Sequence, residues 1–401
     1  MKIAIWHNMP FGGGKRTLYN RVRGLVEKGH YVESWCPDTA DQKVLPLSSL
    51  IKEHIIPFNS FNPEFYSTFR SLPESKALIA MLEDNAQKCL AEIEKKDFDI
   101  IFLNACTFIR TSAISKYTSM PTVLDLPEPY RWFYEALPEL PWVHEELISN
   151  DSLLKRHFKT VSPTMEGMQY QARKEYEYAK ATTKIVANSM YSRECMLRVY
   201  GIDSSVCYAG IDTDEYRPLR SKKEAIILGL GTIYHAKGID RAIRAVAHIK
   251  NNQNIKLVWI GNGAWPEDLK NYIKLAASLG VNFEHFCNIP DKQVKDYLSK
   301  AACLIYTSRL EPFGLAPLEA NASGTAVVGI AEAGIRETVI NGVNGFLTMD
   351  EDYELLGHYL GRFVDDLKYA KSFGLKCRKH IVKNWNYDFG INNIENALSS
   401  V

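Results

Sequence analysis

Two patterns of apolar residues alternate along the chain. Short apolar runs are typical of buried strands, and longer segments have apolar residues at helical spacing. Residues 2–8 (KIAIWHN) form a short run typical of a buried strand, and a glycine-rich turn follows. Apolar residues between positions 18 and 26 then recur at helical spacing up to Gly29, which suits a left-handed helix end. Residues 31–35 return to a strand-like run. This alternation predicts parallel sheets flanked by helices.

The same alternation continues through the rest of the chain. Further strand-like runs lie at residues 100–104, 122–126 and 184–188, and then at 225–230, 256–261, 281–286, 303–306 and 326–330. Residues 210–224 are polar, contain proline and lack periodicity, which predicts an interdomain linker. We therefore expect an α/β protein with two doubly wound domains, residues 1–215 and 216–383. Loops at the carboxyl ends of their strands should face a ligand in a central cleft.

Composition narrows the class of protein further. The 401 residues exceed one ordinary core, and the 46% hydrophobic and 24% charged fractions are ordinary for a soluble globular protein. A net charge of +1 gives no support for a nucleic-acid partner, and no apolar run approaches the length that spans a bilayer. Cys106, Cys207 and Cys303 lie in apolar runs, which favours buried thiols in a reducing compartment. We expect a cytoplasmic protein, with contact at the inner membrane surface left open.

Two glutamates separated by seven residues, Glu311 and Glu319, carry the strongest chemical signal. An apolar run ends at Tyr306, and a helix is predicted to start between Leu315 and Pro317, where proline costs no hydrogen bond. The free amides of that first turn and the helix dipole favour an anion such as a diphosphate. The carboxylates repel phosphate but suit hydroxyl-rich groups on either side, a sugar and a ribose. Taken alone, the pair also fits two solvated acids at a helix start.

Other motifs are weaker. The turn at residues 11–17 does not match a P-loop. That motif requires a glycine where Met9 stands and Ser or Thr where Arg16 stands. Gly13 and Gly14 still let the backbone approach a ligand closely, although a flexible turn has the same composition.

Other short motifs limit the expected chemistry. The G-x-G strings at 229–234 and 261–265 lack a third glycine in register, so a nicotinamide site is not indicated. The D-x-D strings at 97–99 and 212–214 read as strand-start and turn acids. No metal-ligand spacing and no catalytic triad appears, so we expect neither a metal nor another cofactor.

In order and spacing, these motifs resemble those of retaining glycosyltransferase family 4, which has the GT-B architecture of two Rossmann-like domains. The matching segments cover nearly the whole chain: 12–14, 185–201, 206–218, 230–240, 311–319 and 331–347. Residues 384–401 resemble the carboxyl-terminal helix that returns to the N-terminal domain in that family.

The resemblance implies a role for each matching residue. Glu311 and Lys237 would be the catalytic pair, with Glu311 on the donor-sugar hydroxyls and Lys237 on the diphosphate. Glu319 would hold the ribose. The remaining residues expected to bind the donor are Gly13, Gly14, Thr232, Phe313, Gly314 and Leu315.

Two departures from the family pattern affect these expectations. Thr232 stands where an arginine is usual, and Pro127 stands where a histidine usually lies near the reacting sugar. Glu128, Arg131 and Trp132 are therefore the acceptor-side candidates, with a structural role as the alternative.

The interrupted stretch 129–180 adds to the acceptor side. We expect one or two helices and surface loops there. Its aromatics, Trp142 among them, suit stacking on a sugar or contact with a lipid-linked acceptor, and Lys155, Arg156 and Lys159 suit phosphate. The alternative is that the aromatics pack the insertion onto its own domain and the cations face solvent.

The expected activity is transfer of a sugar from a nucleoside-diphosphate sugar to an acceptor hydroxyl, with retention of configuration. The acceptor would be a glycan, a lipid-linked molecule or a small molecule. Two alternatives remain open: a catalytically degenerate scaffold or partner subunit, and a sugar epimerase or phosphorylase with the same architecture.

Overall fold

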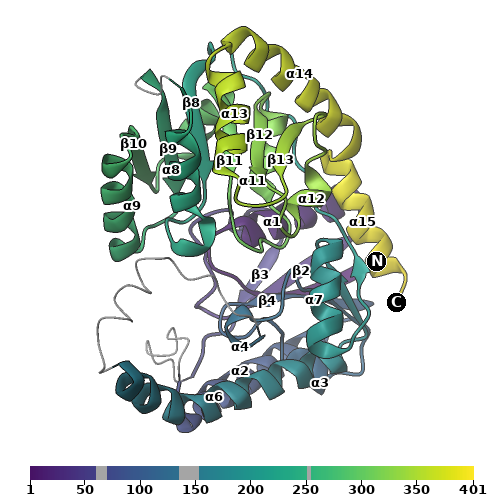
Figure 1. Ribbon diagram of the computed structural model, residues 1–401. Coiled ribbons are helices and arrows are strands. Elements are labelled where there is room, and N and C mark those ends of the chain that lie inside the picture. Colours follow the sequence, from purple (N-terminus) through teal and green to yellow (C-terminus); the bar gives the residue numbers. More distant parts are fainter. Residues whose placement is uncertain (60–69, 135–152, 251–253) are drawn as a thin grey trace. The chain divides into compact units, whose positions relative to one another are not determined.

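The computed structural model describes residues 1–59, 70–134, 153–250 and 254–401, without the side chains of residues 153–164. The chain forms two compact units (Figure 1). The N-terminal unit contains Met1–Tyr208 together with Ile391–Val401, and the C-terminal unit contains Ala209–Gly390. Each unit is built around one parallel sheet, so the alternation of apolar runs and helical patterns correctly predicted an α/β protein with two Rossmann-like domains.

The sheet of the N-terminal unit has the order β3-β2-β1-β4-β5-β6-β7 within the described residues. Its strands are β1 (Lys2–Asn8), β2 (Tyr31–Cys36), β3 (Lys52–Ile55), β4 (Ile100–Cys106), β5 (Thr122–Asp125), β6 (Lys184–Ala187) and β7 (Ser205–Val206). The order reverses between β1 and β4. The loops that follow these two strands therefore flank a topological switch point, where α/β sheets bind their ligands.

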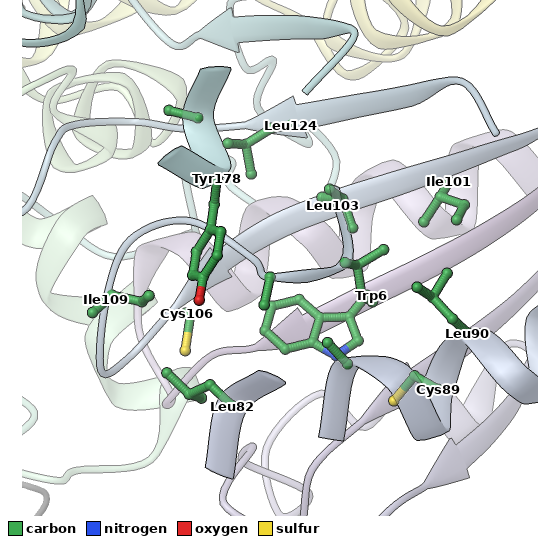
Figure 2. Close-up of a cluster of buried hydrophobic side chains, with 14 of the residues drawn as sticks. Trp6, Leu82, Cys89, Leu90, Ile101, Leu103, Cys106, Ile109, Leu124 and Tyr178 are labelled. Carbon is green, nitrogen blue, oxygen red and sulfur yellow. The ribbon is translucent and has the colours of Figure 1, made fainter. Parts of the chain in front are cut away.

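Helices cover both faces of this sheet. They are α1 (Gly13–Glu27), α2 (Leu72–Ile93), α3 (Ile114–Tyr117), α4 (Arg131–Tyr134), α6 (Leu153–Ala181) and α7 (Met190–Tyr200), with a 3₁₀ turn, η1 (Leu47–Ser49). Alternate residues of β1 serve the two faces, because side chains of a strand point to opposite sides. Ile5 packs with α1, whereas Trp6 packs with α2 in the cluster that Figure 2 shows. In that cluster Leu82 and Leu90 of α2 and Tyr178 of α6 surround the sheet residues.

The sheet of the C-terminal unit repeats the same logic, with the order β10-β9-β8-β11-β12-β13. Its strands are β8 (Glu224–Leu230), β9 (Lys256–Gly261), β10 (Phe283–Cys287), β11 (Ala301–Tyr306), β12 (Ala326–Ile330) and β13 (Gly345–Thr348). Its helices are η3 (His235–Lys237), α8 (Ile239–Ala247), α9 (Pro266–Ser278), α10 (Asp291–Lys300), α11 (Leu315–Ala322), α12 (Ile335–Thr338), α13 (Tyr353–Val364) and α14 (Leu367–Asn384). Here the switch point lies between β8 and β11. The last helix of the chain, α15 (Tyr387–Ser399), passes from this unit into the N-terminal unit at Ile391.

The carboxyl-terminal helix α15 returns to the N-terminal unit, as the resemblance implied. Ile394 and Leu398 are buried in the same cluster as the apolar face of α1. A Cβ at Gly24 of α1 would lie 2.5 Å from the Ile391 side chain, so glycine is needed for this close approach. Glu395 adds ion pairs with Lys28 and with His30, the latter at 2.9 Å.

Candidate active site

The loops that follow β8 and β11 are joined to each other at the switch point of the C-terminal unit. Thr307 donates a hydrogen bond from Oγ1 to the carbonyl of Gly238 at 2.7 Å, and the Arg309 amide donates to the carbonyl of Ala236 at 2.8 Å. Gly238 has φ 64°, and a Cβ there would lie 2.1 Å from the Thr307 carbonyl oxygen. Only glycine permits this contact, which fixes the two loops against each other.

Lys237 and Glu311 meet across this junction. Lys237 ends the 3₁₀ turn after β8, Glu311 lies on the loop after β11, and Lys237 Nζ donates to Glu311 Oε2 at 2.5 Å. The aliphatic part of Lys237 passes over Gly231, where a Cβ would lie 3.2 Å away. Both side chains keep part of their surface exposed, 17% and 27%, so both are accessible to a ligand.

Helix α11 begins four residues after Glu311. Helix α11 starts at Leu315 with Gly314 as its N-cap, and no side chain caps it. Gly314 has φ 87°, and a Cβ there would lie 2.8 Å from Tyr306 Oη. Pro317 has no amide hydrogen to satisfy. The helix start was thus predicted correctly, and its uncapped amides offer a site for an anion beside Lys237.

Glu319 and Phe313 are held more deeply than Glu311. Glu319 is the fifth residue of α11 and is 8% exposed. Phe313 is buried, with its ring centroid 5.8 Å from that of Trp385. The Gly334 amide donates to the Glu311 carbonyl at 3.0 Å, so the loop after β12 also fixes the Glu311 backbone. These contacts hold the segment from Glu311 to Glu319 in place.

An ion-pair network behind the site was not evident in the sequence. Arg241 of α8 pairs with Glu332 at 3.1 Å and also with Glu351, and Arg309 pairs with Glu332 at 3.0 Å and with Glu351 at 3.1 Å. Burial alone would raise the pKa of Glu351, but hydrogen bonds from Tyr353 and Arg241 lower it. The network connects α8 with the loops after β11, β12 and β13, and nothing in the spacing of these residues announces it.

Thr232 lies half-buried on the loop after β8, in the position where the family pattern has arginine. The next residue, Ile233, bonds through its amide to the carbonyl of Gly263 on the loop after β9, at 2.9 Å. Tyr234 and Trp265 reinforce this connection, with ring centroids 5.5 Å apart. Trp265 is 47% exposed and was not among the sequence-predicted site residues.

The glycine turn of the N-terminal unit lies at its own switch point. Gly13 and Gly14 open α1 directly after β1, and a Cβ at Gly14 would lie 2.9 Å from the Met9 side chain. Next to them, Lys15 is fully buried, and burial lowers its pKa. The sequence alone did not indicate that Lys15 is buried.

A group of metal-ligand type also occurs in this unit, although the sequence showed no ligand spacing. His7, Cys36 and Glu53 bring their ligand atoms within 4.8 Å of one another, and His7 Nε2 lies 3.0 Å from Glu53 Oε1. The three residues come from β1, β2 and β3, far apart in sequence. The buried ammonium of Lys15 interacts electrostatically with His7 and Glu53, which works against a bound cation there.

The acceptor-side candidates Glu128, Arg131 and Trp132 lie after β5, also in the N-terminal unit. Arg131 Nε is 3.7 Å from Glu128 Oε2, and Trp132 follows in α4. Trp142 and the side chains of Lys155, Arg156 and Lys159 lie outside the described residues. Within the insertion, α4 and α6 agree with the expected one or two helices.

Both D-x-D strings are engaged in local contacts. Asp99 accepts from the Lys2 amide at 2.7 Å, and Asp97 pairs with Lys2 Nζ at 3.0 Å. Asp212 accepts hydrogen bonds from the amides of Asp214 and Glu215, both at 3.0 Å, as in an Asx turn. These contacts agree with strand-start and turn acids.

Two Rossmann-like units, the second with a lysine–glutamate pair and a free helix start at its switch point, define the two-domain GT-B class of proteins. The family model described as Glycosyltransferase Family 4 matches residues 11–215. The model described as Glycosyl transferases group 1 matches residues 211–380. The chain therefore belongs to glycosyltransferase family 4.

Curated relatives cover part of the chain. A D-inositol 3-phosphate glycosyltransferase of Streptomyces griseus is 27% identical over 245 residues, which is 51% of this chain and 51% of the relative. An uncharacterized glycosyltransferase of Methanocaldococcus jannaschii is 29% identical over 170 residues, 41% of this chain and 42% of the relative. The chain thus spans about half the length of the curated relatives it matches.

Solved structures resemble the whole chain. The Anabaena protein HepE in complex with UDP superposes with a TM-score of 0.71 at 17% identity, covering 100% of both chains. Sucrose-phosphate synthase from Thermosynechococcus elongatus gives 0.72 at 17% identity, covering 100% of this chain and 99% of that one. At this identity the likeness establishes the fold. Among the described helices, none is long and apolar enough to cross a membrane.

Proposed function

We propose that this protein is a retaining glycosyltransferase that moves a sugar from a nucleoside-diphosphate sugar to an acceptor hydroxyl. The observation that carries the proposal is the meeting of Lys237, Glu311 and the uncapped start of α11 at one switch point. A cation, a carboxylate and a helix start without a side-chain cap suit a diphosphate joined to a sugar. The name of the Streptomyces griseus relative and the UDP bound in the Anabaena structure support this choice of substrate class.

Each residue of the donor site then has a distinct task. Lys237 and the amides near Gly314 and Leu315 hold the diphosphate. Glu311 accepts hydrogen bonds from sugar hydroxyls. Glu319 accepts from the ribose hydroxyls. Gly314, Phe313 and Thr232 shape the loops around the donor.

Catalysis would be chiefly electrostatic. As the bond between the anomeric carbon and the diphosphate oxygen breaks, the charge that develops on the diphosphate is stabilised by Lys237 and the helix amides. The acceptor oxygen forms the new bond on the same face of the sugar. The departing phosphate oxygen takes the proton of the acceptor hydroxyl, so no base from the protein is required.

The proposal needs no metal ion, because Lys237 and the α11 amides supply positive charge where the diphosphate charge develops. Transfer should therefore survive EDTA. Loss of all activity in EDTA, restored by manganese or magnesium, would contradict this part of the proposal.

One observation favours a second candidate, a partner subunit that keeps the fold without the chemistry. Thr232 replaces an arginine of the family pattern, which removes one cation from the diphosphate site. The presence of Lys237, Glu311 and Glu319 in one connected loop system favours the enzyme. The two candidates differ in one measurable property, release of nucleoside diphosphate from the donor.

A screen of donors tests the proposal. UDP-, GDP- and ADP-sugars are added to the full chain, and both melting temperature and release of nucleoside diphosphate are recorded, because a ligand stabilises the state that binds it. We expect one nucleotide series to raise the melting temperature and to be turned over. Stabilisation without any turnover, with or without sugar acceptors, would favour the partner subunit. No stabilisation and no turnover with any donor would contradict the proposed enzyme.

A further inference from the structure

Two arginines surround one glutamate in the N-terminal unit. Arg110 lies on the loop after β4, while Glu128 and Arg131 follow β5, its parallel neighbour in the sheet. The carboxyl ends of neighbouring parallel strands lie at one edge, so residues that are 18 and 21 positions apart meet there. We call Arg110, Glu128 and Arg131 the arginine clamp. Sequence reasoning singled out Glu128 and Arg131 but missed Arg110.

The clamp carries more positive than negative charge. Arg110 Nη2 is 3.6 Å from Glu128 Oε1, and Arg131 Nε is 3.7 Å from Glu128 Oε2, so both ion pairs are longer than a hydrogen bond. One carboxylate faces two guanidinium groups. Arg110 also has a buried Nε for which the described structure gives no hydrogen-bond partner. A phosphate would offer the Arg110 guanidinium the hydrogen-bond acceptors that Glu128, at 3.6 Å, does not supply.

Arg110 is held in one orientation. Its guanidinium lies over the ring of Tyr130, 5.4 Å from the centroid, and Tyr130 is itself buried against Phe133. About a third of the Arg110 side chain, 31%, remains exposed. A planar guanidinium fixed on an aromatic ring and open at its edge is suited to paired hydrogen bonds with a phosphate.

A buried carboxylate fixes the two loops that carry the clamp. Glu175 of α6 is fully buried. Its Oε2 accepts from the Arg110 amide at 3.0 Å, and its Oε1 accepts from the Tyr130 amide at 3.0 Å and from the Tyr200 hydroxyl at 2.5 Å. One side chain thus bonds to the backbone of both loops, so the spacing of the clamp depends on Glu175.

We propose that the arginine clamp binds a phosphate group of the acceptor, and that Glu175 is the positioning residue that holds the clamp in shape. The inference rests on the proposed function and names the acceptor class of that enzyme: a hydroxyl compound that carries a phosphate. The same phosphate chemistry occurs in a soluble sugar or polyol phosphate and in a lipid headgroup.

Binding of phosphate probes to the full chain tests the clamp. Glycerol 3-phosphate is titrated by calorimetry, with glycerol as the uncharged control, and co-sedimentation with phosphatidylglycerol vesicles is measured in parallel. We expect Arg110→Gln and Arg131→Gln each to weaken the phosphate probe about tenfold, because each removes a charged hydrogen-bonding group. Arg110→Lys should lie between, since it keeps the charge and loses the planar fork.

The matched control is Arg193→Gln. Arg193 lies on α7 of the same unit, is 34% exposed, and pairs with Asp203 at 2.7 Å, away from the clamp residues in sequence and in pairing. Equal losses in Arg193→Gln, or unchanged affinity in the clamp variants, would overturn the proposal, as would the absence of binding to both probes. Clamp-dependent binding to the vesicles alone would assign the phosphate to a lipid headgroup, and to glycerol 3-phosphate alone, to a soluble acceptor.

The role of Glu175 has its own readout. In Glu175→Gln one amide hydrogen of the loops would face a side-chain NH₂ and lose its acceptor, so affinity for glycerol 3-phosphate should fall at least threefold, by rough expectation for one hydrogen bond. Tyr200→Phe removes one hydrogen bond only and remains testable if Glu175→Gln fails to fold. A merely structural role would lower the melting temperature of both variants without a change in phosphate affinity at a temperature where they are folded.

Nucleotide binding separates this inference from the proposed function. The clamp lies in the N-terminal unit, whereas Lys237, Glu311 and Glu319 lie in the C-terminal unit, so clamp variants should keep the affinity of the wild type for the nucleoside diphosphate found in the donor screen. If the clamp variants bind the phosphate probes as tightly as the wild type does, while nucleotide binding is intact, the clamp proposal alone is overturned. Absence of nucleotide binding in the wild type would overturn the proposed function instead.

Discussion

Lys237 Nζ lies 2.5 Å from Glu311 Oε2, so the cation proposed for the diphosphate and the carboxylate proposed for the sugar are paired with each other. Both side chains keep part of their surface exposed, 17% for Lys237 and 27% for Glu311. The ammonium has three hydrogens to donate, so one group can bind more than one acceptor. A donor can therefore share Lys237 with Glu311.

Glu311→Gln should reduce turnover more than nucleotide binding. The carboxylate accepts hydrogen bonds from the sugar in this account, and a charged hydrogen bond is worth roughly 1.5–3 kcal/mol, about ten- to a hundredfold in rate if it acts in the transition state. Steady-state kinetics with the donor chosen by the screen measures kcat/KM. Glu284→Gln is the matched control, because Glu284 forms a similar surface pair with Lys256 at 2.8 Å. An unchanged kcat/KM in Glu311→Gln would remove its assigned role.

Lys237→Ala should distinguish the diphosphate from the nucleoside. The lysine contacts phosphate oxygens in this account, so the variant should bind the nucleoside diphosphate at least tenfold more weakly, by rough expectation, and the nucleoside almost as well as the wild type does. Calorimetry with both ligands gives the comparison, and Lys256→Ala serves as the control. Equal losses for nucleoside and diphosphate would place Lys237 elsewhere in the site.

Glu319→Ala should weaken the free nucleoside diphosphate and the intact donor alike, because its partner is the ribose that both contain. We expect a loss of about tenfold for each ligand. Since Glu319 is only 8% exposed, the melting temperature should also be measured. A 2′-deoxy nucleotide is the informative companion ligand, because it should gain little from Glu319 in the wild type. If the deoxy nucleotide loses as much as the ribonucleotide does in Glu319→Ala, the ribose contact is wrong.

Glu33 makes the N-terminal unit sensitive to acid. Burial alone would raise its pKa, but hydrogen bonds from Lys96, Tyr31 and His54 outweigh burial and lower the pKa to about 2. A group with a lowered folded-state pKa stabilises the protein above its unfolded pKa, near 4.5, and this contribution is lost as the pH falls through about 2. Glu33→Gln should therefore lower the melting temperature at pH 7, and the difference from the wild type should shrink below pH 4. A constant difference from pH 7 to pH 3 would contradict this origin of the effect.

The sequence was sufficient for the elements that bury long apolar runs. The strands β1, β8, β9, β11 and β12 and the start of α11 agree with the expected segments within one or two residues, because burial on both faces leaves a continuous apolar signal. Strand β3 was not predicted. It is a four-residue strand at the edge of its sheet, with the polar sequence KEHI, and an edge strand needs no such signal.

The site residues divide in the same way. Glu311 and Glu319 were singled out by their spacing around a predicted helix start, and Lys237 by the family resemblance; their roles at the site stay predictions. The pairing of Lys237 with Glu311 spans 74 positions, and the contacts of Glu175 with Arg110 and Tyr130 span 65 and 45. Such contacts depend on which strands are neighbours in the sheet. Periodicity identifies the strands but does not give their order.

Amide hydrogen exchange on the full chain, with and without the donor identified by the screen, tests the central claim most directly, because it reports where the donor binds. The account predicts that the donor slows exchange in residues 231–238 and 311–319 of the C-terminal unit, and that Lys237→Ala reduces this protection at the same donor concentration. Donor-dependent protection confined to other segments, with these two loops unchanged, would contradict the account.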